Sequence, residues 1–176
     1  LRGDGRAWRC GVVANPLGTS GTPDGNLWAG PLLDSYGFDL PRIGHLPATP
    51  ESTAEATSAK NTTIAIVATD AALNPAQVTR MASGAHAGIA RAIHPSHTLF
   101  DGDTVFAVAT GDVSLPEDFA ASTLDQVAIT AAAADALSLA VIDAHVAAAP
   151  VEDSWGQPPT LSDVAPDFAE AFAALE

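Results

Sequence analysis

An asparagine followed by two threonines, Asn61-Thr62-Thr63, stands directly before an apolar run and could carry nucleophilic chemistry. The run Ile64–Ala68 is uninterrupted and rich in β-branched residues, which predicts a strand buried on both faces. A hydroxyl group at the start of such a strand would be held rigidly by the sheet. If the bond before Thr62 were cut, Thr62 would carry a free α-amine that can take the proton from its own hydroxyl.

Two other interpretations of these residues stay open. The same three residues fit the Asn-x-Thr acceptor pattern for N-glycosylation, which matters only in a secreted chain. Threonine is also a good strand residue, so Thr62 need have no chemical role. The residues by themselves therefore leave the nucleophile as one interpretation among several.

Two carboxylates lie at the entrance of a second predicted strand, and an amide ends a third. Asp101 and Asp103 flank a glycine and precede the apolar run Thr104–Gly111. Such a pair could orient a nucleophile or hold a proton, and a solvated turn is an equally good interpretation. A calcium loop would need further ligands at EF-hand spacing, which are missing. Asn15, at the end of the short strand 10–15, is either a functional group at a strand end or a turn residue before proline.

Metal and redox chemistry find little support in the sequence. His94 and His97 lie close together, but no third ligand has a suitable spacing, so we expect no metal site. Cys10 is the single cysteine, which rules out an intrachain disulfide, and its apolar neighbours indicate a core residue. We also expect no cofactor.

Charge excludes several classes of partner. The 176 residues include 7 basic and 21 acidic side chains, for a net charge of −14. Such acidity argues against nucleic acid and against anionic membrane surfaces, and we interpret it as favouring solubility. The long alanine-rich run near 126–149 is interrupted by Asp135 and Asp143, which argues against a membrane span. The single cysteine fits a reducing compartment, and we expect a cytoplasmic protein.

The elements that must position these residues follow from their periodicity. Asn74 and Pro75 begin a helix that runs to about Ile93, with apolar residues at helical spacing. The segment from Ser122 to about Ala147 is apolar nearly all round, which predicts a largely buried helix. A last short helix is expected within 167–175. Together these elements predict a layered α/β sandwich that has few strands for its helices.

The region 19–60 shows no periodic pattern and contains several prolines and glycines. A structureless segment of this length is usually functional or disordered, and it is a natural site for a chain break.

Three stretches of the sequence together resemble a known family in order and length. They are Gly11-Val12-Val13-Ala14-Asn15-Pro16-Leu17-Gly18, Asn61-Thr62-Thr63-Ile64-Ala65-Ile66-Val67-Ala68-Thr69-Asp70-Ala71 and His97-Thr98-Leu99-Phe100-Asp101-Gly102-Asp103-Thr104-Val105-Phe106-Ala107-Val108-Ala109-Thr110-Gly111.

The sequence resembles the self-processing aminopeptidase/amide hydrolase family, which includes L-aminopeptidase/D-esterases, β-peptidyl aminopeptidases and 6-aminohexanoate-oligomer (nylon oligomer) hydrolases. The resemblance covers most of residues 1–149 and is strongest to the nylon-oligomer endo-hydrolases. It implies an α/β (α+β) fold, an αββα four-layer sandwich of the N-terminal-nucleophile-like type, of which this chain supplies only part.

The resemblance also implies a precursor that cuts itself between Asn61 and Thr62. Residues 1–61 would then be the C-terminal portion of the α chain, ending in a processing loop. Residues 62–176 would be the β chain, which begins with the nucleophile. The chain starts at Leu1 in what looks like a turn, so we expect a piece of a larger fold.

The family's site residues match four positions. Thr62 matches the nucleophile, Asn15 the asparagine at a strand end, and Asp101 and Asp103 the acidic pair. In the nylon-oligomer branch a lysine upstream of the strand 10–15 also contributes, and this sequence has no counterpart for it.

On this resemblance we expect an amide hydrolase of the N-terminal-nucleophile type that acts on linear aliphatic amide oligomers such as 6-aminohexanoate oligomers. Its partners would be the upstream α segment and further copies, in a homo-oligomer of αβ units. One alternative is an aminopeptidase or β-peptidyl aminopeptidase on the same scaffold. Others are a non-catalytic, unprocessed subunit and an acyltransferase related to ornithine acetyltransferase.

Overall fold

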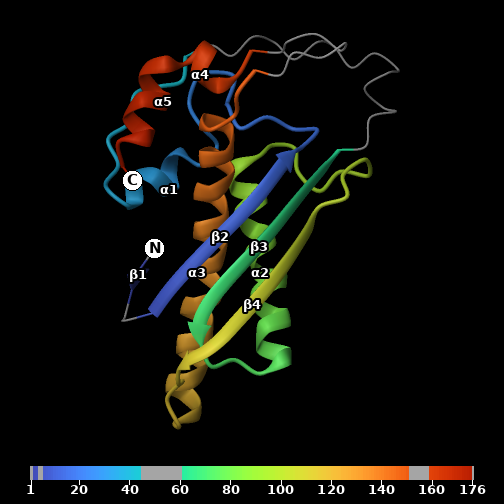
Figure 1. The fold of residues 1–176 in the computed structure, drawn as a ribbon, viewed down its shortest axis with the longest axis vertical. Coiled ribbons are helices and arrows are strands. Elements are labelled where there is room, and N and C mark those ends of the chain that lie inside the picture. Colours follow the sequence, from blue (N-terminus) through green and yellow to red (C-terminus); the bar gives the residue numbers. More distant parts are fainter. Residues whose placement is uncertain (1, 4–5, 45–60, 151–158, 176) are drawn as a thin grey trace.

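A single sheet runs through the computed structural model, which describes residues 2–3, 6–44, 61–150 and 159–175. Its strands are β1 (Arg2–Gly3), β2 (Arg6–Asn15), β3 (Thr62–Ala71) and β4 (Thr104–Val113), and they lie side by side in that order (Figure 1). β2 and β3 are antiparallel, and β3 and β4 are parallel. The end of β2 and the starts of β3 and β4 therefore share one edge of the sheet. The predicted processing loop, which ends at residue 61, lies mostly outside the described residues.

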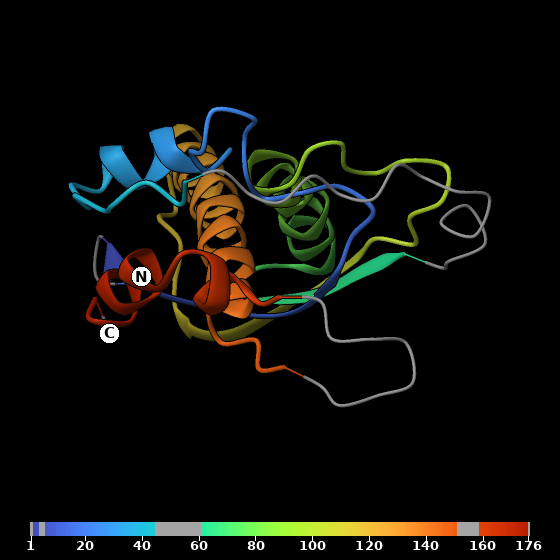
Figure 2. The ribbon, with the colours of Figure 1, turned by 90° about the horizontal axis from the view of Figure 1, so that it is seen from above.

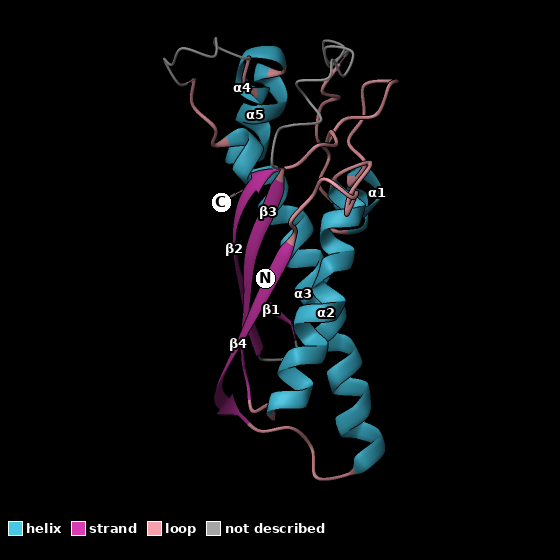
Figure 3. Ribbon diagram, turned by 90° about the vertical axis from the view of Figure 1, so that its right-hand side faces the viewer, coloured by secondary structure: helices cyan, strands magenta, loops and turns pink. Residues whose placement is uncertain are grey.

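Two long helices cover one face of this sheet. They are α2 (Pro75–Ala92) and α3 (Phe119–Val146), which pack against each other and against the strands (Figures 2 and 3). The described residues also contain three short helices, which are α1 (Gly30–Ser35), α4 (Leu161–Val164) and α5 (Pro166–Ala173). The predicted α/β class is confirmed. The chain supplies one sheet and one helical layer of the four layers that the resemblance implies.

The starts of both long helices follow from local hydrogen bonds. The Asn74 side chain accepts from the Gln77 N–H and the Gln77 side chain accepts from the Asn74 N–H, which is the predicted start of α2. α3 begins earlier than predicted, at Phe119 rather than near Ser122. The cause is Asp118, whose side chain accepts from the Ala121 N–H and so caps an additional turn.

Within the described residues nothing covers the second face of the sheet, which corrects the prediction that β3 is buried on both faces. Ala65 and Val67 are buried against the helices, but Ile64 is 49% exposed and Ile66 is 46% exposed. On the neighbouring strands Val13, Phe106 and Val108 are also exposed. Their register with β3 places them on this same face, because side chains alternate along each strand. We call this apolar surface the open face.

The helix α3 also departs from its prediction. Its second half is buried around Leu137 and Val141, but Phe119, Leu124 and Val127 in its first half are exposed. Figure 1 shows these first turns extending past the lower end of the sheet, beyond the strands of the described residues. By length and composition alone α3 could cross a membrane, and in the structure it packs along α2 and β2.

The described part of the region 19–60 is pinned to the helical layer. Thr19 exchanges two backbone hydrogen bonds with His94, of 3.0 and 2.9 Å, directly after α2. Leu33 on α1 is buried in the core. The short helix α1 was not predicted, because a segment of six residues carries too little periodicity to be recognised. The expected last helix is confirmed as α5.

Candidate active site

The four predicted site residues meet at the shared edge of the sheet. Asn15, the last residue of β2, lies directly opposite Thr62, the first residue of β3. Asn61 forms a parallel bridge with Asp101, and the Thr63 N–H donates to Asp103 Oδ1 at 2.8 Å. Strand order alone accounts for this meeting, because one strand ends and two strands begin at this edge.

Thr62 belongs to the open face. Side chains alternate along β3, so Thr62 points to the same side as Ile64 and Ile66, away from the helices. Asn15 is its cross-strand partner and shares that side. Thr63 points the other way and is fully buried. The candidate nucleophile therefore stands where the open face reaches the edge of the sheet.

The carbonyl oxygen of the Asn61–Thr62 peptide bond accepts two hydrogen bonds. Thr62 Oγ1 donates to the carbonyl oxygen of Asn61 at 2.6 Å. The N–H of Gly102 donates to the same oxygen at 2.8 Å. A carbonyl with two donors is polarised, and a donor fixed on its oxygen would stabilise negative charge that develops there during attack.

The backbone of Gly102 lies close to the Thr62 side chain. A Cβ on Gly102 would stand 2.9 Å from Thr62 Oγ1 and 3.6 Å from Thr62 Cγ2. The glycine of the Asp101–Asp103 turn thus leaves room for the hydroxyl while its own N–H binds the Asn61 carbonyl.

Asp101 ties the acidic turn to its surroundings. Its Oδ2 accepts from the N–H of Thr98 at 2.8 Å and from the hydroxyl of Thr98 at 2.7 Å. Its Oδ1 accepts from the Leu17 N–H at 3.3 Å, just after β2. Burial raises the pKa of Asp101, but the hydrogen bonds together have the larger effect and lower it. The pKa of Asp101 is therefore below the usual aspartate value. The ionised carboxylate of Asp101 therefore links the segment after β2 to the turn before β4 through its hydrogen bonds.

Asp103 holds the backbone next to Thr62. Its side chain is 4% exposed, and its Oδ1 accepts the Thr63 N–H. Its Oδ2 lies 2.8 Å from Nδ1 of His97. Within the described residues neither carboxylate accepts a hydrogen bond from Thr62 Oγ1, whose partner is the Asn61 carbonyl. The acidic pair therefore contacts the residues around Thr62, and its predicted action on the hydroxyl and the amine stays a prediction.

Three residues of this edge were missed by the sequence reasoning. Gly102 could have been found, because a glycine between two candidate catalytic acids signals a close backbone approach. Thr98 and His97 carry no comparable signal. Their contacts depend on how the segment between α2 and β4 folds back on the acidic turn, which no local pattern reveals.

Other candidates for chemistry lie away from this edge. Burial raises the pKa of the Cys10 thiol to about 11, so its nucleophilic thiolate form is scarce near neutral pH. In the ranges that the structure describes, no three His, Cys, Asp or Glu side chains gather closely enough to hold a metal ion.

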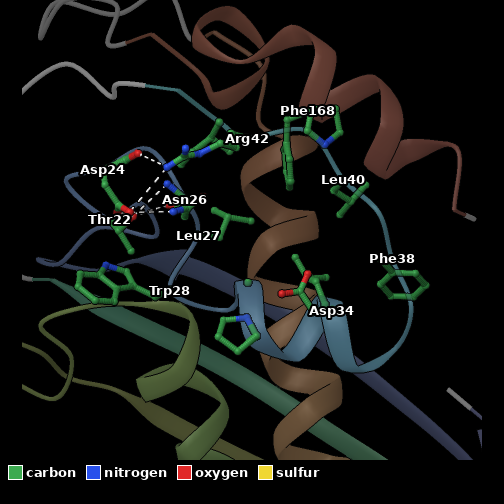
Figure 4. Close-up of a pocket in the computed structure, with 15 residues that line it drawn as sticks. Thr22, Asp24, Asn26, Leu27, Trp28, Asp34, Phe38, Leu40, Arg42 and Phe168 are labelled. Atoms are coloured by element: carbon green, nitrogen blue, oxygen red, sulfur yellow. Dashed lines mark hydrogen bonds and ion pairs between the residues drawn. The ribbon is translucent and has the colours of Figure 1, made fainter.

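A pocket of about 470 Å³ lies between α1, α5 and the segment that leads into α1 (Figure 4). On its rim Arg42 donates to the Asp24 carbonyl at 2.7 Å and lies 3.7 Å from the Asp24 carboxylate. Phe168 and Leu40 line it from other segments. None of its lining residues belongs to the edge around Thr62, so it takes no part in that site.

Comparison with curated proteins identifies relatives with related names. The chain is 46% identical over 112 residues to an uncharacterized aminopeptidase of Mycobacterium tuberculosis (strain ATCC 25618 / H37Rv), covering 60% of this chain and 31% of that protein. It is 39% identical over 154 residues to an uncharacterized aminopeptidase of Mycobacterium leprae (strain TN), covering 78% and 40%. It is 34% identical over 106 residues to a 6-aminohexanoate-oligomer endohydrolase of Paenarthrobacter ureafaciens, covering 60% and 30%. The chain thus spans only 30 to 40% of the length of these relatives.

Comparison with solved structures finds a Burkholderia sp. beta-aminopeptidase, with a TM-score of 0.49 and 30% identity over 66% of this chain and 35% of that one. A sequence profile gives the family. The profile of peptidase family S58 matches residues 25–158, which is more than half of the chain and includes Thr62 and both acids of the turn. This chain therefore belongs to peptidase family S58.

Proposed function

We propose that this chain is part of an amide hydrolase of the N-terminal-nucleophile type, and that it cuts itself between Asn61 and Thr62. Membership of peptidase family S58 supports hydrolysis of amide bonds. The observation that carries the proposal is the Thr62 hydroxyl, which lies 2.6 Å from the carbonyl oxygen of the bond to be cut.

The self-cleavage would proceed in two balanced steps. Thr62 Oγ1 attacks the carbonyl carbon of Asn61, the bond to the Thr62 nitrogen breaks, and the hydroxyl proton ends on that nitrogen. Water then hydrolyses the resulting ester, which leaves a carboxylate on Asn61 and a free α-amine on Thr62. The Gly102 N–H, 2.8 Å from the Asn61 oxygen, would hold the negative charge of the intermediate.

In the mature protein Thr62 would attack substrate amides. Its α-amine takes the hydroxyl proton and returns it to the leaving amine, and water then releases the acyl group from Thr62 Oγ1. Asn15 lies opposite Thr62 on the same face and would donate to the oxyanion, an interaction often worth about 3 kcal/mol per donor. The acidic pair would keep the surrounding backbone in place through Thr63 and Leu17.

Two substrate classes follow from the relatives. Linear aliphatic amide oligomers such as 6-aminohexanoate oligomers are supported by the 34% identical relatives that are named for that activity. Peptides with a free N-terminus are the second candidate, because the relatives with 46% identity are named aminopeptidases. Both substrates would have to reach Thr62 at the edge of the sheet where β3 begins.

The first test is the intact mass, under denaturing conditions, of the full-length protein that carries these residues, together with N-terminal sequencing. We expect two pieces, the second beginning Thr62-Thr63-Ile64. Thr62→Ala should remain one chain, and Thr62→Ser should still be cut, because it keeps the hydroxyl. An uncut wild-type protein would overturn the proposal. Assays with 6-aminohexanoate oligomers and with α- and β-aminoacyl amides then separate the two substrate classes.

A further inference from the structure

His97 has an unusual backbone conformation, and its side chain contacts Asp103 of the candidate site. Its φ is 54°, and among the described residues other than glycine it alone has a positive φ. This left-handed conformation costs a residue with a Cβ about 1–2 kcal/mol, so contacts elsewhere must hold it.

The contacts of the His97 ring stabilise this left-handed conformation. Nδ1 lies 2.8 Å from Asp103 Oδ2, and Nε2 lies 3.4 Å from the His86 carbonyl oxygen on α2. The two histidine rings also touch, with centroids 5.1 Å apart. Because a carboxylate can only accept, Nδ1 of His97 must carry the proton in this bond, whether the ring is neutral or charged.

Asp103 passes this contact on to the strand that carries Thr62. Its second oxygen accepts the Thr63 N–H at 2.8 Å. A continuous line of polar contacts thus runs from His97 through Asp103 to the peptide that follows Thr62. Without the His97 donor, the nearly buried carboxylate would lose a partner and could turn away from Thr63.

We propose that His97 is a positioning residue that fixes Asp103, and through Asp103 the peptide after Thr62, so that the Thr62 hydroxyl stays aligned for attack. This inference rests on the proposed function. The His97 ring contacts His86 on α2, which covers the face of the sheet opposite to the one that Thr62 points to, so His97 lies on the helical side of the sheet. Losing it should lower kcat and leave KM nearly unchanged, because small misplacements of a nucleophile are costly in rate.

Two substitutions at this position separate the donor from the backbone conformation. His97→Gly accepts the positive φ without strain but removes the Nδ1–H. His97→Asn also tolerates the left-handed region and can place an amide N–H near the position of Nδ1. His86→Ala is the matched control, since it removes the ring contact and leaves the bond to Asp103 intact.

The experiment uses the full-length protein and measures self-cleavage, kcat, KM and hydrogen exchange of the Thr63 amide. We expect His97→Gly to lower kcat and the cleavage rate by about tenfold or more, to keep KM within about twofold, and to speed exchange at Thr63. His97→Asn should recover most of the loss, and His86→Ala should stay near wild type.

Three outcomes would overturn the proposal. Wild-type rates in His97→Gly would show that the contact does not align Thr62. A His97→Asn variant as slow as His97→Gly would show that the donor is not what matters. An inactive, uncut wild-type protein would remove the proposed function as well, and this result is distinct from an active wild type whose variants are unaffected.

Discussion

Gly102 leaves the space that the Thr62 hydroxyl occupies, because a Cβ on Gly102 would stand 2.9 Å from Thr62 Oγ1. Gly102→Ala should therefore displace the hydroxyl and slow self-cleavage and turnover by about tenfold or more. Gly11→Ala is the control, since its Cβ would meet Ile66 at an ordinary 3.6 Å. Mass spectrometry over a time course after synthesis measures the cleavage rate. Equal rates in both variants would mean that the close approach has no effect on Thr62.

Asp101 should contribute stability that depends on pH. Its pKa is lowered in the folded protein, because the hydrogen bonds from Thr98 and Leu17 outweigh the effect of burial. A group with a lowered pKa stabilises the fold above its unfolded value, about 3.9, and loses that contribution as the pH falls through the folded value. Asp101→Asn should cost about 1 kcal/mol in free energy of unfolding at pH 7, and the difference from wild type should shrink below about pH 4. Denaturant unfolding of both proteins at pH 7 and pH 3 measures this, and a difference that does not change with pH would contradict it.

The sequence was sufficient for the two long helices and the three long strands, and the family resemblance implied the meeting of the four candidate residues. Helical spacing and caps located α2 and α3, and apolar runs located β2, β3 and β4, because these signals are local. Once the strands are known, Asn15, Thr62 and the two acids fall at strand ends, and such ends can share an edge. The contacts of His97 and Thr98 could not be predicted, because they form between segments that only the folded chain brings together.

The errors in burial have a related cause. An unbroken run such as Ile64–Ala68 is apolar on both sides, and this pattern shows that both faces avoid water. The pattern does not show whether the residues of this chain cover both faces of the strand. In the described residues the helices cover one face only, so Ile64 and Ile66 remain exposed.

The contact between α2 and α3 makes a prediction about stability. A Cβ on Gly88 would clash with the Ala134 carbonyl oxygen, a backbone atom that cannot move aside alone. Gly88→Ala should separate the helices and lower the free energy of unfolding by about 1–3 kcal/mol, despite the better helix propensity of alanine. Gly30→Ala is the control, because a Cβ there meets nothing within 4 Å. Thermal unfolding followed by circular dichroism compares the two, and a stabilised Gly88→Ala would mean that the interface yields easily.

The open face provides a test of the four-layer fold. If a second sheet covers it in the full-length protein, Ile66 is a core residue there, although it is 46% exposed in this chain. Ile66→Lys would then bury a charge without a partner and should lower the melting temperature of the full-length protein by more than about 10 °C or prevent its assembly. Leu99→Lys changes an exposed leucine in the turn between α2 and β4, outside the strands, and should leave the melting temperature nearly unchanged. If both variants melt like the wild type, the open face stays in contact with water, and the substrate could reach Thr62 across the whole of that face. If only Ile66→Lys is destabilised, the approach to Thr62 is restricted to the edge of the sheet, between Asn15 and the acidic turn.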